Sequence, residues 1–260
     1  MSIKPNSQES GVLESASQLH YADSRDPDIR YLTGMYMPDS YLVFTKGKRK
    51  IGVATINEYT RMVKESSLDE VLLLEEVREQ ASSHLKLPEN KTPDNTQIVR
   101  YLAEKNGIRK FRVGSRFSAG LLTELQKVGI EFDVDLEDDL LPQRKVKTED
   151  ELKRLRKANR ASAEGFRLVE KALAESKVSK GVLVHKGKVL TSEKLRQQIS
   201  HACLDEGAIS MDTIVAIGDQ ACDSHCAGYG PIRAGELIVV DIFPQRIEDG
   251  YWGDMTRTYL

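Results

Sequence analysis

The segment Glu236-Leu-Ile-Val-Val-Asp-Ile-Phe-Pro-Gln-Arg-Ile-Glu-Asp-Gly-Tyr-Trp-Gly-Asp-Met-Thr-Arg-Thr258 carries the strongest structural signal in this sequence. After Glu236, residues 237–240 are apolar and mostly β-branched, as is typical of a buried strand. Asp249-Gly250 is a turn signal, and Met255 to Tyr259 has the pattern of a return strand. The segment therefore predicts a β-hairpin that carries one carboxylate, Asp241 or Asp254, on each arm.

Asp241 and Asp254 are symmetric about the middle of this hairpin, so we expect them to face each other across the two strands. Directly opposed Cβ atoms lie roughly 4.5–5.5 Å apart. Two buried carboxylates at that separation repel each other unless a proton or a cation lies between them. A divalent metal ion, or a pair of them, satisfies this requirement. The alternative is that the aspartates serve turn chemistry alone, with Asp249-Gly250 as an off-centre tight turn.

Asp241 together with Gly250-Tyr-Trp-Gly-Asp-Met-Thr-Arg-Thr258 resembles the first metal-ligand hairpin of the creatinase/aminopeptidase P metallopeptidases. Their "pita-bread" fold also includes prolidases and methionine aminopeptidases. The resemblance implies that Asp241 binds one metal ion and Asp254 bridges two. Two features differ from the family pattern: Phe243 stands where the family usually has glycine, and the two aspartates are 13 positions apart, a longer spacing than usual.

The resemblance also implies the cofactor, two divalent metal ions. An oxygen-rich ligand set suits Mn²⁺ best, with Co²⁺, Zn²⁺ and Fe²⁺ as alternatives.

A second match lies upstream, where Met211–Gly218 is followed by His225 and by Gly230–Asp241. This order resembles the family segment that carries a substrate-binding, proton-transferring histidine. The resemblance implies that His225 is catalytic and makes no direct metal contact.

A lone histidine is otherwise most often structural. A zinc site made of Cys222, His225 and Cys226 is a further alternative, but the remaining cysteine, Cys203, lies in a predicted helix and no fourth ligand is evident.

Composition limits the other classes of function. The chain has 260 residues, enough for two domains, and its net charge of −2 gives no reason to expect nucleic acid or an anionic membrane as partner. Its apolar runs are too short to span a bilayer, and the N-terminus lacks the apolar core of a signal peptide. Three cysteines do not form a disulfide framework. We therefore expect a cytoplasmic protein. A peptide substrate and a homodimer are implied by the resemblance alone.

The chain is predicted to have two domains. Residues 1–140 are predicted to form an α/β domain, because strands and helices alternate from Asp26 to about Phe132, with residues 1–20 flexible. Ser40–Thr45 and Lys50–Thr55 predict a hairpin, and Asp28–Gly34 resembles an opening motif of the creatinase-type N-terminal domain. The acidic run Asp133–Asp139 predicts a solvated linker.

Residues 148–260 are expected to form the first part of an α+β pita-bread catalytic domain. Thr148-Glu-Asp-Glu151 is a capping box that opens a long amphipathic helix, and Thr191 is expected to start another.

The resemblance implies a metal-dependent aminopeptidase or dipeptidase that cleaves the N-terminal peptide bond, most closely an Xaa-Pro aminopeptidase or prolidase. The two-domain layout favours these over methionine aminopeptidases. The family places a further histidine and two glutamates beyond the second aspartate, and this sequence ends at Leu260. We therefore expect a truncated chain that is inactive by itself. The alternatives are a non-catalytic peptide- or protein-binding module on the same scaffold, and a metal-free creatinase-like amidinohydrolase.

Overall fold

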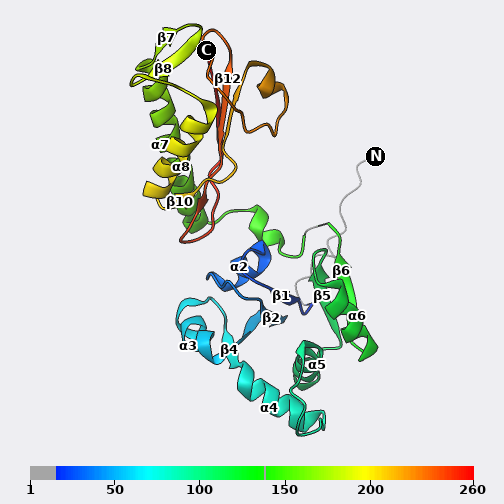
Figure 1. Cartoon of the computed structure of the whole chain (residues 1–260). Helices are drawn as coiled ribbons and strands as arrows, with labels where there is room; N and C mark the ends of the chain where they lie inside the picture. The colour runs from blue at the N-terminus through cyan, green and yellow to red at the C-terminus, as the bar shows by residue number, and fades with distance from the viewer. Residues whose placement is uncertain (1–15, 138) are drawn as a thin grey trace, which may run out of the picture. The chain divides into compact units, whose positions relative to one another are not determined.

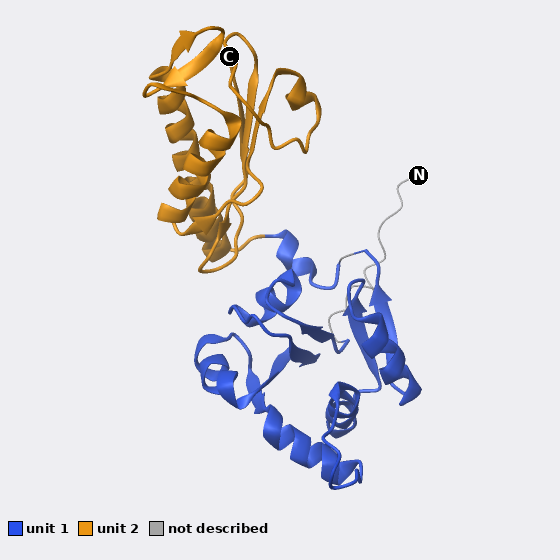
Figure 2. Cartoon of the chain, in the orientation of Figure 1, with its two compact units in different colours: residues 1–146 blue, residues 147–260 orange. Residues whose placement is uncertain are grey.

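The computed structural model describes residues 16–137 and 139–260. The chain divides into two compact units, residues 1–146 and 147–260 (Figure 2). The boundary falls in the interval between the two predicted domains. Each unit has its own buried apolar core.

Unit 1 contains a four-stranded sheet in the order β1-β2-β3-β4 and a separate two-stranded parallel sheet, β5-β6 (Figure 1). Pairing in the larger sheet is antiparallel except for β3 with β4, which is parallel. The predicted hairpin is confirmed by β2 and β3. The strands are β1 (Leu19–Ala22), β2 (Tyr41–Lys46), β3 (Arg49–Ala54), β4 (Glu70–Leu73), β5 (Lys110–Gly114) and β6 (Glu131–Asp135).

The helices of unit 1 differ in how clearly their ends are encoded. A capping box between Asp94 and Gln97 opens α5, which ends at left-handed Gly107. Helix α4 was not predicted from the sequence; it follows β4 directly and has no side-chain cap. The helices are α2 (Pro27–Thr33), α3 (Ile56–Glu65), α4 (Leu74–His84), α5 (Asn95–Asn106), α6 (Ala119–Lys127) and the short 3-10 helix Pro142–Lys145.

Two predictions about unit 1 need correction. Leu19 and His20 fall in the stretch predicted to be flexible, yet they lie in β1 and are buried; residues 1–15 lie outside the described part. The acidic run is not solvated throughout, because Asp135 is 6% exposed. Its carboxylate accepts hydrogen bonds from the Arg112 side chain (3.3 Å) and from the backbone N–H of Asp139 (2.6 Å).

Unit 2 packs two long helices against a three-stranded antiparallel sheet in the order β11-β12-β14 (Figure 1). The Thr148–Glu151 capping box opens α7 (Glu149–Ala174), and Thr191 caps α8 (Ser192–Asp205), both as predicted. The sheet strands are β11 (Ile214–Ile217), β12 (Ile238–Ile242) and β14 (Met255–Tyr259). Smaller elements are β7 (Lys177–Ser179), β8 (Val182–His185), β9 (Lys188–Val189), β10 (Ala208–Ile209), β13 (Gln245–Arg246) and the 3-10 helix η2 (Gly218–Cys222).

The two faces of the β11-β12-β14 sheet have different surroundings. Val240 and Ile242 of β12 are buried in one core cluster with Ile199 of α8. A Cβ atom on Gly165 of α7 would lie 2.9 Å from the Ile242 side chain, so glycine allows the helix to approach the sheet closely. Because side chains alternate along a strand, Asp241 points to the opposite face. We call this the open face of the sheet.

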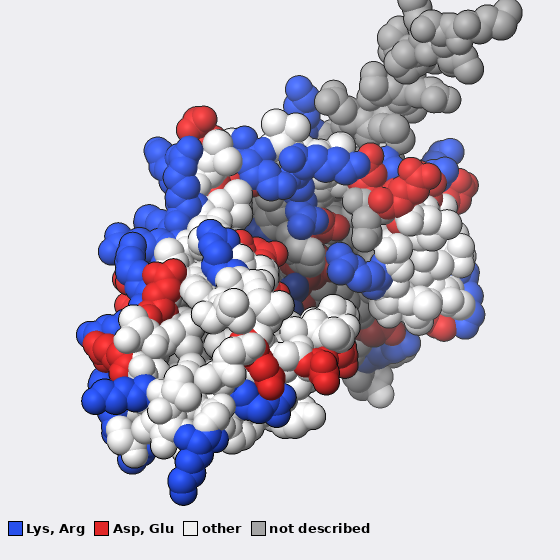
Figure 3. Space-filling model, turned by 90° about the horizontal axis from the view of Figure 1, so that it is seen from above, with Lys and Arg blue, Asp and Glu red and all other residues white. Residues whose placement is uncertain are grey.

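The surface carries both signs of charge. Figure 3 shows lysine, arginine, aspartate and glutamate side chains interspersed, with uncharged areas between them. No helix in the described ranges combines the length and the hydrophobicity that crossing a bilayer requires.

Candidate metal and substrate site

The register of the hairpin differs from the predicted one. Asp241 lies opposite Thr256, and the Thr256 hydroxyl donates a hydrogen bond of 2.5 Å to Asp241 Oδ1. The prediction that Asp241 faces Asp254 directly is therefore wrong by two residues. The cause is the turn: Gly250 has φ +72° and its N–H bonds the Arg246 carbonyl at 3.0 Å, which moves the hairpin centre by one residue.

A shift of two residues keeps each side chain on its own face of a sheet. The register continues beyond the Ile242–Met255 pair, since Gly253 N–H donates to the Pro244 carbonyl at 2.9 Å. Asp254 therefore lies opposite Phe243. Asp241 and Asp254 are then diagonal neighbours on the open face, with backbones roughly 7–8 Å apart. That separation leaves room for cations between the two carboxylates.

Helix α7 fixes the segment that leads into Asp254. Asn159 Oδ1 accepts a hydrogen bond from Asp254 N–H at 3.1 Å. A Cβ atom on Gly253 would lie 2.5 Å from the Ala158 carbonyl oxygen, so the loop touches the helix backbone and only glycine fits there. The Gly-Tyr-Trp-Gly-Asp segment thus packs against helix α7 and also carries the Asp254 carboxylate.

Tyr251 provides a second anchor on the same helix. Its hydroxyl donates to Glu151 Oε1 at 3.0 Å, and the Arg154 guanidinium lies over its ring, 5.8 Å from the centroid. Neither Asn159 nor Arg154 was predicted as a site residue, since neither belongs to a recognisable motif.

His225 lies on an exposed loop after η2, held by a turn in which its N–H donates to Asp223 Oδ1 at 3.1 Å. It lines a pocket of about 550 Å³ together with Phe243 and Ile214. Ile214 is the β11 partner of Asp241. His225 therefore shares a pocket with two immediate neighbours of Asp241. The rest of the lining consists of Arg196, Gln197, Ser200, Met211, Asp212, Thr213 and Ala227.

The carboxylates of Asp241 and Asp254 have the chemistry of metal ligands and could supply part of a metal site. Asp254 is exposed, and its carboxylate has no hydrogen-bond partner among the described residues. Carboxylate oxygens are hard donors of the kind that divalent cations take. The described ranges contain no group of three or more His, Cys, Asp or Glu side chains arranged to hold a metal ion. Asp241 and Asp254 thus fit a divalent ion as two ligands of a larger set.

The zinc alternative finds no support in the described ranges, which lack such a ligand group. Cys203 is fully buried in the unit 2 core and its thiol contacts the Ala161 carbonyl at 3.6 Å. Burial raises the pKa of this thiol to about 11, so it stays protonated. Cys203 is a core residue.

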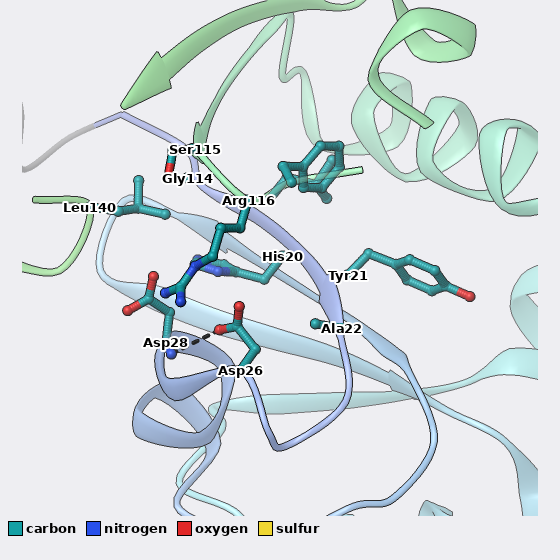
Figure 4. Close-up of a pocket in the computed structure, with 11 residues that line it drawn as sticks. His20, Tyr21, Ala22, Asp26, Asp28, Gly114, Ser115, Arg116 and Leu140 are labelled. Atoms are coloured by element: carbon teal, nitrogen blue, oxygen red, sulfur yellow. Dashed lines mark hydrogen bonds between the residues drawn. The ribbon is translucent and has the colours of Figure 1, made fainter. Parts of the chain in front are cut away.

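Unit 1 contains a small polar cavity of about 40 Å³, room for a few water molecules. Figure 4 shows the Arg116 side chain directed toward Asp26 and Asp28, with His20 behind it. Burial lowers the pKa of His20 to about 4, which keeps its imidazole neutral. Burial also raises the pKa of Asp28, against the attraction of its ion-pair partner Arg144. The cavity is too small for a peptide substrate.

The similarity to a known protein family lies in unit 2. The sequence profile of metallopeptidase family M24 matches residues 153–260. No curated protein sequence matches the chain significantly.

Several solved structures have the same fold as the described chain. Prolidase from Pyrococcus furiosus has a TM-score of 0.69 at 16% identity, with 97% of this chain and 68% of that chain covered. X-Pro aminopeptidase from Thermotoga maritima has a TM-score of 0.71 at 17% identity, with coverages of 96% and 64%. Aminopeptidase P from E. coli has a TM-score of 0.66 at 17% identity, with coverages of 96% and 60%.

The chain thus spans between 60% and 68% of the length of these three proteins. At such identities the likeness shows the fold, which is the one expected from the sequence. Residues 153–260 are thus similar to metallopeptidase family M24, and the chain has the fold of the creatinase/aminopeptidase P, or pita-bread, proteins.

Proposed function

We propose that this chain is part of a metal-dependent aminopeptidase or dipeptidase, of Xaa-Pro aminopeptidase or prolidase type, that uses two divalent metal ions. The observation that carries the proposal is the placement of Asp241 and Asp254 on one open sheet face within the M24 region. The similar structures include a prolidase, an X-Pro aminopeptidase and an aminopeptidase P, which supports the same substrate class.

Each residue has a distinct part in the proposal. Asp241, oriented by the Thr256 hydroxyl, would hold one ion, and Asp254, fixed through its N–H by Asn159, would bridge both. When bound, such ions polarise the scissile carbonyl and activate the attacking water. His225 would donate a hydrogen bond to the substrate carbonyl as negative charge develops on it. Carboxylate donors suit Mn²⁺, which we propose as the bound ion.

The test compares peptide cleavage and metal content. A form of the protein with a complete ligand set, loaded with Mn²⁺, is expected to hydrolyse Xaa-Pro dipeptides or Xaa-Pro-Xaa tripeptides. Asp254→Asn keeps the side-chain shape but removes one charge, so it should abolish cleavage and reduce bound metal while the circular dichroism spectrum stays unchanged. The described residues supply these two ligands, so turnover by this chain alone would contradict the assignment.

A second candidate is a non-catalytic peptide- or protein-binding module. It is favoured by the lack of a group of three ligands in the described ranges. In that case peptides would bind without being cleaved under any metal condition, and Asp254→Asn would leave peptide affinity unchanged.

A further inference from the structure

The loop that carries His225 is held by a side chain from helix α8. Arg196 Nη1 donates to the Ala227 carbonyl at 2.5 Å and to the Gly228 carbonyl at 2.8 Å. These two carbonyls follow His225 by two and three residues. Arg196 is flanked on α8 by Leu195 and Ile199, which are fully buried in the unit 2 core. The guanidinium is therefore attached to a rigid element and ties the loop to it.

The loop has two further polar attachments just beyond this point. Glu193, one turn before Arg196 on α8, accepts a hydrogen bond from Gly230 N–H at 3.0 Å. The Gln220 side-chain amide pairs with both backbone groups of Tyr229, accepting from its N–H and donating to its carbonyl, each at 3.0 Å. Backbone groups from 227 to 230 are thus held individually, although this part of the loop has no regular secondary structure.

Steric contact restricts the same loop from the side of the sheet. Gly228 has φ +84°, and a Cβ atom there would lie 1.6 Å from the Val215 carbonyl oxygen. Val215 N–H also donates to the Ala227 carbonyl at 3.0 Å. The loop backbone is thus placed between β11 and the Arg196 guanidinium.

His225 itself has few contacts. Its N–H donates to Asp223, and Cys226 N–H donates to the Asp223 carbonyl at 3.0 Å, so both bonds are local to the turn. Its imidazole has no hydrogen-bond partner among the described residues and faces the pocket. The position of the ring therefore depends on the backbone that follows it.

We propose that Arg196 is a positioning residue that fixes the His225 loop by binding the carbonyls of Ala227 and Gly228. The inference rests on the proposed function, in which His225 contacts the substrate. Arginine suits this task because its planar guanidinium binds carbonyl oxygens at fixed angles, whereas lysine has a flexible point charge and a shorter reach. A misplacement of about 1 Å at a catalytic group can cost 10²-fold in rate.

The first test is independent of activity. Hydrogen–deuterium exchange at residues 226–230 is compared in the unaltered chain, Arg196→Gln, and the control Lys194→Gln, which removes an exposed charge from the same helix. Arg196→Gln should speed exchange in the loop by roughly tenfold or more, with Lys194→Gln unchanged. Equal exchange in all three proteins would overturn the proposal. Arg196→Lys, which keeps the charge, serves the same comparison if Arg196→Gln does not fold.

The second test asks whether Arg196 acts through His225. In an active Mn²⁺-loaded form, Arg196→Gln should lower kcat/KM by about tenfold or more and should have little further effect in the His225→Ala background. It should also change the pH profile of kcat/KM, whereas Lys194→Gln should not. Additive losses would mean that Arg196 contacts substrate directly, which contradicts positioning.

If no form cleaves peptides, the proposed function fails and the imidazole NMR signal of His225 still decides the positioning role. A shifted or broadened signal in Arg196→Gln supports it, and an unchanged signal overturns it.

Discussion

Replacing Gly253 by alanine should displace the segment that carries Asp254. The new Cβ atom would lie 2.5 Å from the carbonyl oxygen and 2.7 Å from the carbonyl carbon of Ala158, and 2.9 Å from Ser162 Oγ. Real Cβ contacts below 3.0 Å essentially do not occur, and the two closest atoms are helix backbone that cannot rotate away. Gly253 does not have a positive φ, so steric contact alone opposes the substitution.

The expected cost has two parts. Overpacking of this kind costs about 1–3 kcal/mol. Loss of the hydrogen bond between Asp254 N–H and Asn159 adds about 1 kcal/mol. Gly253→Ala should therefore lower the free energy of unfolding of unit 2 by roughly 2–4 kcal/mol.

Urea denaturation followed by tryptophan fluorescence measures this directly, because Trp252 is the only tryptophan of the chain and adjoins the substitution. Asn159→Ala isolates the hydrogen bond and should cost about 1 kcal/mol. Gly120→Ala is the matched control in helix α6 of unit 1, where the nearest atom is 3.8 Å away; followed by circular dichroism, it should be stabilising by about 0.5–1 kcal/mol. A loss below about 0.5 kcal/mol in Gly253→Ala would refute the docking of this loop on α7.

Three further predictions concern other groups. Burial lowers the pKa of His20 from 6.5 to about 4. The contribution of His20 to the stability of unit 1 is therefore complete above pH 6.5 and is lost as pH falls toward 4, on the order of 3 kcal/mol. Urea unfolding at pH 7 and 4.5 should show a weaker pH dependence of stability in His20→Gln than in the unaltered chain, and an equal dependence contradicts this. Asp135→Asn leaves Arg112 without its most buried partner and should destabilise unit 1 by about 3 kcal/mol. Asp133→Asn, at an exposed carboxylate 3.7 Å from Arg112, should have little effect. Equal effects of the two substitutions in urea unfolding would be inconsistent with this. His225→Ala should lower kcat/KM of the active form by about 10²-fold with bound metal unchanged, and metal loss in step with activity would place His225 among the ligands.

Local signals in the sequence predicted the helix ends well. The Thr148–Glu151 box and the Thr191 cap are each contained within a few residues, so their hydrogen bonds can be expected without knowledge of the fold. Helix α4 starts directly after a strand with no capping side chain, so the sequence contains no capping signal for its start.

The site was predictable only in part. The hairpin and the two aspartates follow from strand and turn patterns. Their register does not, because it depends on how the Arg246–Gly250 turn closes. Asn159 and Arg196 were missed because each acts on a backbone group far away in sequence, 95 residues from Asp254 and 31 from Ala227. Neither contact leaves a local pattern in the sequence.

The central claim is that Asp241 and Asp254 bind the same metal centre, and Mn²⁺ titration of the chain followed by electron paramagnetic resonance tests it most directly. The unaltered chain should bind Mn²⁺ weakly, since it supplies two carboxylates. Asp241→Asn and Asp254→Asn should each lower that affinity by roughly tenfold, as loss of a charged ligand requires, whereas Asp205→Asn, at an exposed carboxylate of α8, should leave it unchanged. Equal Mn²⁺ affinity in all four proteins would contradict a shared metal site.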